Sequence, residues 1–387
     1  MKKISILALI VALSISLTGC FGGESKLYNA FNKMQDVTSI ESNMEMKFNF
    51  ETEGFSEEDQ LMLGQVAAMV NNSKISMNQK ARNNKEKTVS EAQVDMNMNF
   101  GGIGMDMNVW VDMDMSTDEL KMKEIIKMPQ ILMSSMVPND PQKQYLVLDM
   151  GQMMKEENKE INFNELMKFS KEFQPKLTEF IRGIQKDFKP NLKIVEKKGS
   201  KVVNKEELDI YELKLNDAAL KELVRDTVNY SFDNEKIIEF VKEYMTAVVN
   251  IVPQAEKETV EVDMIEGLGE FEKQLPELKI KFNDFMDKYK DVKILGDKGI
   301  VIEYGINKEG YIVYQVASID LRIDLEQIAK ITGEETVQKG IIKLGINFST
   351  NNSNINNKDM KIEIPAINEK NSIDYMKMMN MQRERIN

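Results

Sequence analysis

Two residue types that carry much of enzyme chemistry are almost missing from this chain. Its 387 residues contain no histidine and a single cysteine, Cys20. Histidine is the usual general base near neutral pH and the commonest ligand of zinc, so Ser-His-Asp and Cys-His arrangements are excluded. One cysteine also allows no internal disulfide. No serine is followed three residues later by lysine, which excludes the Ser-x-x-Lys pattern of penicillin-binding enzymes.

The remaining enzyme motifs are incomplete or uninformative. Gly102-x-Gly104 and Gly267-x-Gly269 lack the later glycine of a dinucleotide-binding fingerprint, and no phosphate-binding loop occurs. A hydrolase that uses two carboxylates stays open, because the chain has 63 acidic residues, but no spacing singles out a pair. We therefore expect a protein that is not an enzyme and that needs no cofactor.

Methionine is the most unusual residue type, with 29 copies. Many stand two positions apart, as in the pairs 44/46, 96/98, 105/107 and 113/115. Thioethers spaced in this way suit Cu(I), so a copper site built from Met105, Met107, Met113 and Met115 is one interpretation. Alternation along a β-strand explains the same spacing without a metal. Flexible, polarizable methionine side chains also suit a surface that accepts irregular apolar ligands.

A second metal pattern starts at Asp112-x-Asp114-x-Ser116, which is similar to the beginning of a calcium-binding loop. Thr117 stands where such a loop needs glycine, and Lys123 stands where it needs a bidentate acid. We therefore expect a solvated turn and no metal. The only tryptophan, Trp110, shares this polar strand face, where it would either touch a partner or cover a neighbouring element.

Charge narrows the range of partners. The net charge of the chain is −12 and its pI is about 5.0. An acidic protein is repelled by phosphate backbones and by anionic lipid surfaces. We expect no nucleic-acid partner.

The first twenty residues have the pattern of a secretory signal. Lys2 and Lys3 precede an apolar run over residues 4–17, which is too short to span a bilayer comfortably. The run ends in Leu17, Thr18, Gly19 and Cys20, which resemble the bacterial lipobox. That resemblance implies removal of residues 1–19, attachment of diacylglycerol and a further acyl chain such as palmitate to Cys20, and a lipid-anchored protein on the extracellular face of the cell membrane. Residues 20–25 would form a short tether.

Hydrophobic periodicity predicts the elements of the body. Helical spacing indicates helices at residues 25–37, 56–70, 163–188, 217–229, 234–250 and 268–289, with Pro175 and Pro276 kinking or dividing two of them. Alternation indicates a strand over 44–50 and further strands at 73–80, 91–100, 104–115, 118–127, 144–150, 191–197, 206–215, 291–296, 299–306, 311–323, 340–349 and 358–364.

Strands before and after a helical block at 217–289 favour an α+β fold. We expect one large curved antiparallel sheet, a half-barrel, with the helices packed on its concave face. A single domain would cover residues 26–368 and a polar C-terminal tail residues 369–387, with a further loose stretch at 351–357.

The order of these features resembles the LolA/LppX-like superfamily, to which lipoproteins of unknown role in Gram-positive anaerobes are related. The resemblance lies in the lipobox, the short helix, the strand that begins Ser42-Asn43-Met44-Glu45-Met46-Lys47-Phe48, and the later Tyr211-Glu212-Leu213-Lys214-Leu215 that leads into a helix at Asp217. It implies an unclosed barrel that wraps helices and holds acyl chains between them.

The residues expected to line such a cavity alternate along three predicted strands. They are Met44, Met46, Phe48, Met96, Met98, Met105, Met107, Val109, Val111 and Met113. The leading hypothesis is a membrane-anchored lipoprotein that binds or carries a lipid or another hydrophobic envelope molecule. The alternative is an envelope interaction protein with a packed core and an acidic docking surface. The oligomeric state stays open.

Overall fold

A computed structural model describes residues 25–117, 121–138, 140–156, 163–249, 254–332 and 339–386. Its main element is a sheet of twelve strands in the order β12-β6-β5-β4-β3-β2-β1-β11-β10-β9-β8-β7. Neighbouring strands pair antiparallel, except that β12 pairs parallel with β6. The strands are β1 Ser39–Glu53, β2 Lys74–Asn83, β3 Val89–Phe100, β4 Ile103–Asp114, β5 Lys121–Lys127, β6 Tyr145–Asp149, β7 Val195–Val203, β8 Glu206–Leu215, β9 Leu295–Ile306, β10 Ile312–Asp324, β11 Ile341–Ser353 and β12 Ser372–Asp374.

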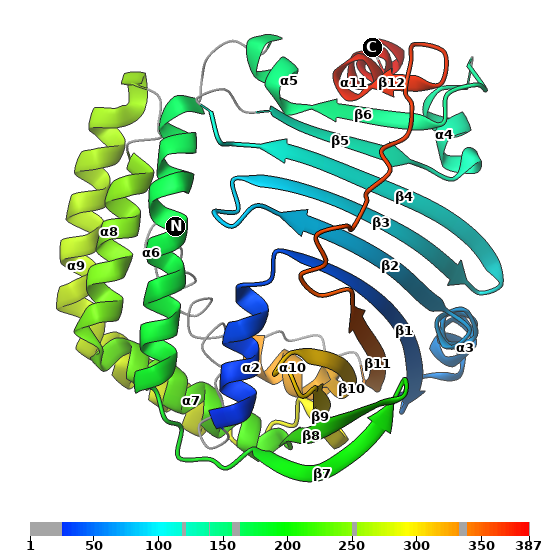
Figure 1. Cartoon of the computed structure of the whole chain (residues 1–387). Helices are drawn as coiled ribbons and strands as arrows, with labels where there is room; N and C mark the ends of the chain where they lie inside the picture. The colour runs from blue at the N-terminus through cyan, green and yellow to red at the C-terminus, as the bar shows by residue number, and fades with distance from the viewer. Residues whose placement is uncertain are drawn as a thin grey trace.

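The sheet is strongly curved and does not close into a barrel. Figure 1 shows it bending from β6 to β7 around helix α2, with α6, α8 and α9 standing together across the open side. The helices are α2 Ser25–Gln35, α3 Glu57–Asn71, α4 Gln130–Met136, α5 Met150–Glu156, α6 Phe163–Asp187, α7 Asp217–Asp233, α8 Glu235–Val249, α9 Gln254–Lys288, α10 Leu325–Thr332 and α11 Tyr375–Ile386. The predicted α+β half-barrel is confirmed.

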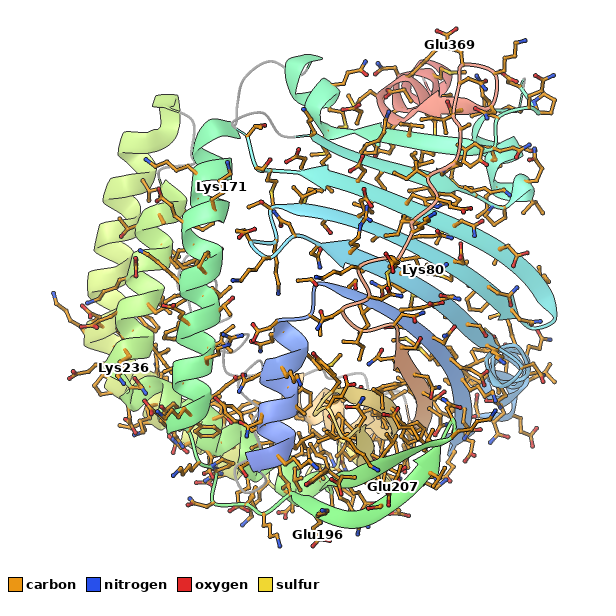
Figure 2. The ribbon with its side chains drawn as sticks, viewed as in Figure 1. Lys80, Lys171, Glu196, Glu207, Lys236 and Glu369 are labelled. Carbon is orange, nitrogen blue, oxygen red and sulfur yellow. The ribbon has the colours of Figure 1, made fainter. Side chains whose placement is uncertain are left out.

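Charged side chains mark the outside of this arrangement. In Figure 2, Lys236 lies on the outer side of the helical layer, and Glu196 and Glu207 lie on the outside of the β7–β8 hairpin.

Lys171 of α6 donates a hydrogen bond to the carbonyl oxygen of Thr117 at 3.0 Å. The helical layer is therefore tied by a hydrogen bond to the chain segment that follows β4.

Local sequence explains several element boundaries. The Ser56 hydroxyl accepts a hydrogen bond from the backbone N–H of Asp59, so Ser56 is the predicted N-cap of α3. Asn204 and Lys205 both have positive φ, at 50° and 69°, which suits the two-residue turn between β7 and β8.

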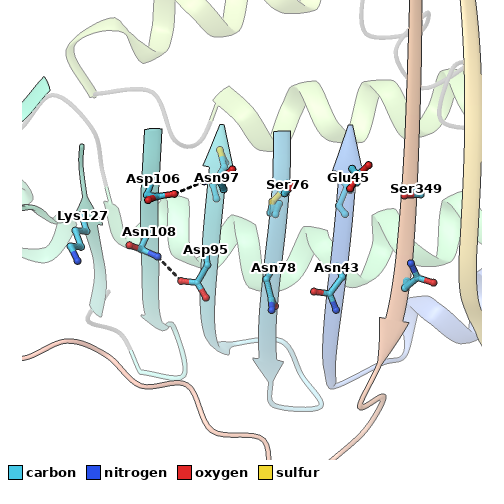
Figure 3. A pocket seen from close by; sticks show the side chains of 14 residues that line it. Asn43, Glu45, Ser76, Asn78, Asp95, Asn97, Asp106, Asn108, Lys127 and Ser349 are labelled. Atoms are coloured by element: carbon cyan, nitrogen blue, oxygen red, sulfur yellow. Dashed lines mark hydrogen bonds between the residues drawn. The ribbon is translucent and has the colours of Figure 1, made fainter. Parts of the chain in front are cut away.

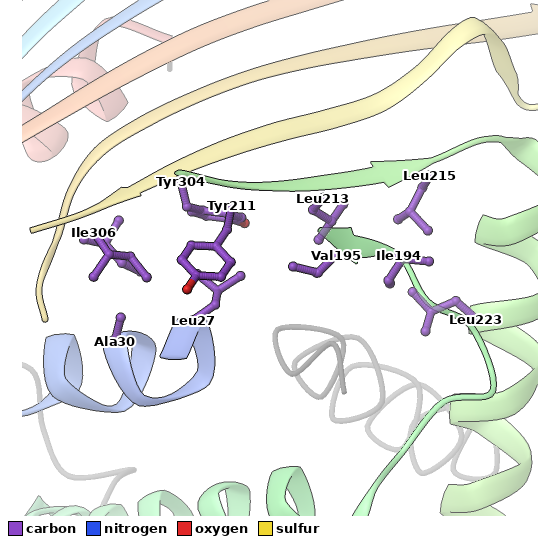
Figure 4. Packing of buried hydrophobic residues seen from close by; sticks show 11 residues of the cluster. Leu27, Ala30, Ile194, Val195, Tyr211, Leu213, Leu215, Leu223, Tyr304 and Ile306 are labelled. Atoms are coloured by element: carbon purple, nitrogen blue, oxygen red, sulfur yellow. The ribbon is translucent and has the colours of Figure 1, made fainter. Parts of the chain in front are cut away.

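The best-packed part of the core lies where α2 and α7 meet strands β7, β8 and β9. It contains Leu27, Ala30, Ile194, Val195, Tyr211, Leu213, Leu215, Leu223, Tyr304, Ile306 and Ile312. Figure 4 shows α2 presenting Leu27 and Ala30 to this side of the sheet. The ring of Phe31 meets that of Tyr304 edge-on at 5.3 Å. Burial raises the pKa of Tyr304 to about 12.

Some predicted elements were wrong. Residues 358–364 form no strand, and the pairing of β7 begins at Val195 instead of residue 191. Helices α6 and α9 continue through Pro175 and Pro276 and are not divided, because a proline removes only one hydrogen bond while the flanking turns keep theirs. Helix α9 is also longer than expected, since it begins at Gln254.

The C-terminal segment is not a loose tail. Residues 372–374 add β12 to the edge of the sheet beside β6, and α11 follows directly. Ile373 and Met378 are buried with Met133 and Leu146. Tyr375, Met379 and Met381 pack against the same cluster, so the apolar side of α11 covers this edge of the sheet.

Candidate functional site

The strand registers bring the methionines into rows. Met44 lies opposite Met77, Met77 opposite Met96, and Met96 opposite Met107. The next row on the same face runs through Met46, Ile75, Met98 and Met105. Opposed residues of antiparallel strands point to the same side of a sheet, so two continuous apolar rows cross β1 to β4.

These rows lie on the concave face. Tyr304 is opposite Gln315, Gln315 is opposite Thr350, and Thr350 is opposite Met44. All four therefore share one face, and Phe31 of α2 packs on Tyr304. Since α2 lies inside the curve of the sheet (Figure 1), the methionine face is the inner one.

All ten residues expected to line the cavity share this concave face. Val109, Val111 and Met113 continue the alternation of β4, and Phe48 continues that of β1. Each of the ten is partly exposed, and none belongs to a buried cluster of the described residues. An apolar face of this extent that is not fully covered is unusual in a folded protein.

Further members of the face were missed in the sequence. Phe348 lies opposite Met46, and Ile346 lies opposite Phe48. Met77 and Ile75 belong to the same rows and are also partly exposed. The alternation in predicted strands 73–80 and 340–349 carries this signal, but only the pairing of β11 with β1 shows that its apolar side continues the methionine rows.

The helices opposite this face pack mainly on one another. Ile184 of α6 and Ile237 of α8 form one buried cluster, and Val241 of α8 and Phe271 of α9 form another. Phe180 and Phe240 stack at 3.9 Å between ring centroids. No buried cluster in the described part of the chain joins α6, α8 or α9 to strands β1 to β6. The helical layer thus has its own core, and in the described part of the chain no buried cluster covers the apolar face of β1 to β4.

The outer face of the same strands is polar. Asn43, Asn78, Asp95, Asn108 and Lys127 form one row across five strands. Figure 3 shows them around a depression of about 680 Å³, in which Asn108 donates to Asp95 at 2.7 Å. This depression lies on the opposite side of the sheet from the methionine rows.

Trp110 also lies on the outer face, where it is 8% exposed. Its ring packs near Tyr145 at 6.3 Å, and a cavity of about 220 Å³ separates it from Ile364, Pro365 and Ile367. Segment 358–368, predicted to contain a strand, is instead an irregular stretch that passes over this part of β4 and β5. Of the two roles considered for Trp110, the structure supports contact with a neighbouring element.

Among the described residues, the fold brings no further carboxylate ligand to the calcium-like motif at Asp112 and Asp114. Asp114 accepts hydrogen bonds from the backbone and hydroxyl of Ser116, and these bonds lower the pKa of its carboxyl. Among the described residues, no group of three or more His, Cys, Asp or Glu side chains is placed to hold a metal ion. Of the four methionines in the copper hypothesis, Met105, Met107 and Met113 lie in three different rows of the sheet, and Met115 follows the end of β4.

The lipobox residues Leu17, Thr18, Gly19 and Cys20 lie outside the described residues. Within the described part of the chain, no helix is long and apolar enough to cross a membrane. The predicted lipid anchor on Cys20 stays a prediction.

Comparison with known proteins finds few matches. No family model matches the chain, and no curated protein matches it. Solved structures similar to it include the Mycobacterium tuberculosis lipoprotein LppX, at 8% identity over 88% of this chain and 97% of that chain, with a TM-score of 0.25. A DUF1329 family protein from Desulfovibrio piger is similar at 8% identity over 92% of this chain and 94% of that chain, with a TM-score of 0.17.

Both TM-scores lie below 0.5, and no function is transferred from either protein to this chain.

Proposed function

We propose that this chain binds or carries a lipid, or another hydrophobic envelope molecule, against its concave face. The observation that carries the proposal is the pair of methionine rows, which are apolar, partly exposed and joined to no helix by a buried cluster of the described residues. Acyl chains are long, flexible and apolar, and removing them from water contributes about 0.8 kcal/mol for each CH₂ group. Methionine adapts its shape to such chains better than branched residues do.

The site supports binding without catalysis. The two methionine rows contain no group able to transfer a proton near neutral pH. We propose that the chain acts as a carrier or receptor and not as an enzyme. The lipobox supports the further proposal that it works at the outer surface of the cell membrane, held there by acyl chains on Cys20.

A matched pair of variants tests the site. Met44→Gln with Met77→Gln places two amides in the apolar row, whereas Asn43→Gln with Asn78→Gln changes an opposed pair on the outer face of the same two strands. Because a poorly paired amide in an apolar site costs roughly 1–3 kcal/mol, the methionine variant should bind a fluorescent acyl probe about tenfold or more weakly. The asparagine variant should bind it like the wild type.

Native mass spectrometry gives an independent measurement. The chain from residue 20 with Cys20→Ser, purified from the soluble fraction of its expression host, should carry a bound lipid mass that the methionine variant loses. A folded wild-type chain that carries no lipid and binds no acyl probe would overturn the proposal. It would leave the envelope interaction protein as the better hypothesis.

A further inference from the structure

Helix α3 is apolar on most of its surface and yet is not buried. Four of its side chains are largely open to solvent: Leu61 is 75% exposed, Met62 60%, Met69 50% and Val66 37%. No residue of the helix is buried. Met62, Val66 and Met69 follow at steps of four and three, so they lie on one side of the helix. An apolar helix side is normally covered by a partner, in a protein core or in a membrane.

The exposed surface of α3 continues at the neighbouring hairpin. Ile103 at the start of β4 is 69% exposed, and a side chain at Gly101 would come within 3.1 Å of Met69. We call Leu61, Met62, Val66, Met69 and Ile103 the α3 patch. Ile103 lies opposite Phe100 and alternates with Met105, so it belongs to the face that carries the methionine rows. The α3 patch therefore meets the edge of the concave apolar face at the hairpin between β3 and β4.

Charge shows what kind of surface would fit the patch. Helix α3 contains no lysine or arginine, and its acidic residues Glu57, Glu58 and Asp59 are confined to the first turn. Helix α3 itself therefore offers no basic side chain to anionic headgroups, and no charged side chain opposes insertion of its aliphatic residues beyond the first turn. Figure 1 shows α3 apart from the other helices, beyond the end of β1.

The described chain begins at Ser25, and Lys26 in the first turn of α2 pairs with Asp209 of β8. The predicted tether from Cys20 to Ser25 is five residues long and would reach at most about 18 Å.

We propose that the α3 patch docks this chain onto a lipid bilayer, at the rim across which an acyl chain passes between the bilayer and the concave face. This inference rests on the proposed function, because the bilayer is the source or destination of the ligand. Docking brings the methionine rows next to the acyl region, so that the ligand does not cross open water.

The test uses vesicles of phosphatidylcholine and the chain from residue 20 with Cys20→Ser, so that no acyl anchor contributes. The docking variant carries Leu61→Gln, Met62→Gln and Met69→Gln, which keep good helix formers at exposed positions. Its control carries Ile131→Gln, Val202→Gln and Ile280→Gln, which are 74%, 70% and 62% exposed in other elements.

Flotation with vesicles should show about tenfold or more weaker binding for the docking variant and unchanged binding for the control. Binding should not depend on salt, and addition of phosphatidylglycerol should not strengthen it. Binding of the acyl probe without vesicles should stay at the wild-type level, while transfer of the probe from vesicles to the protein should become slower.

Several results would overturn the inference. These are equal vesicle binding by the docking variant, binding that grows with phosphatidylglycerol and falls with salt, or a change from dimer to monomer that shows a second copy as the occupant. The two proposals fail separately: a chain that binds vesicles through α3 but takes up no acyl probe keeps the docking surface and loses the proposed ligand.

Discussion

Asp217, the first residue of α7, holds that helix to the beginning of β9. Its carboxylate accepts hydrogen bonds from the backbone N–H groups of Ile294 at 2.7 Å and Leu295 at 2.9 Å, and it pairs with Lys221 at 2.6 Å. Burial alone would raise the pKa of this carboxyl, but the hydrogen bonds from Lys221, Leu295 and Ile294 outweigh burial and leave the pKa below 3.8. One ionised side chain thus joins segments far apart in the sequence.

Asp217→Asn should lower the free energy of unfolding by about 1–3 kcal/mol at neutral pH, because it removes charged hydrogen bonds from a largely enclosed site. A carboxyl whose pKa is lower in the folded state stabilises the fold above its unfolded pKa, and this contribution is lost as the pH falls through the folded pKa. Urea unfolding measures the free energy of unfolding of wild type and variant at pH 7 and pH 3. The difference between the two proteins should be smaller at pH 3. Asp284→Asn, at an exposed position of α9, should have little effect.

At the scale of the elements, Gly340 sets how the chain enters β11. Its φ is +139°, and a Cβ atom there would lie 2.5 Å from two ring carbons of Phe55. Its carbonyl oxygen accepts a hydrogen bond from the backbone N–H of Leu325 at 3.0 Å, at the start of α10. This glycine therefore lets β11, α10 and the segment after β1 approach closely.

Gly340→Ala should destabilise the protein by about 2–4 kcal/mol, because the alanine combines a strained φ with a clash against an aromatic ring. Thermal unfolding of this variant and of Gly104→Ala measures the effect, since Gly104 has open space around its Cβ position and no positive φ. Equal melting temperatures for the two variants would show that Phe55 moves aside without cost.

The element scale also shows where sequence patterns were sufficient. Alternation along β4 correctly placed Met105, Met107 and Met113 on one face, because the period of a strand is local. The C-terminal strand and helix were missed because β12 has only three residues and is stabilised by its neighbour β6. A short edge strand leaves almost no periodic signal.

At the scale of the whole molecule, the predicted anchor decides where the concave face works. Changing Cys20 to serine should move the protein from the membrane fraction to the soluble fraction after a carbonate wash, because acyl burial would be lost while the α3 patch alone holds more weakly. Metabolic labelling with palmitate should label the wild type and not the variant. A Cys20→Ser protein that still floats with membranes after the wash would contradict the anchor.

The sequence alone determined which enzyme classes are excluded, where strands alternate, and which residues share a face of a strand. These properties depend on composition and on neighbours along the chain. The sequence also carried the lipobox pattern at Cys20. Tertiary structure decided which face is concave, because that depends on the pairing of β1 with both β2 and β11 and on the position of α2.

Tertiary structure also decided which apolar surfaces stay uncovered. Apolar periodicity predicts a buried side on α3 and a buried face on β1 to β4, yet no residue of α3 is buried and the methionine rows are partly exposed. Burial is a property of the whole arrangement, since it depends on what lies across the space from a side chain. Periodicity along the chain identifies only which side of a helix or strand is apolar, and not whether another element covers that side.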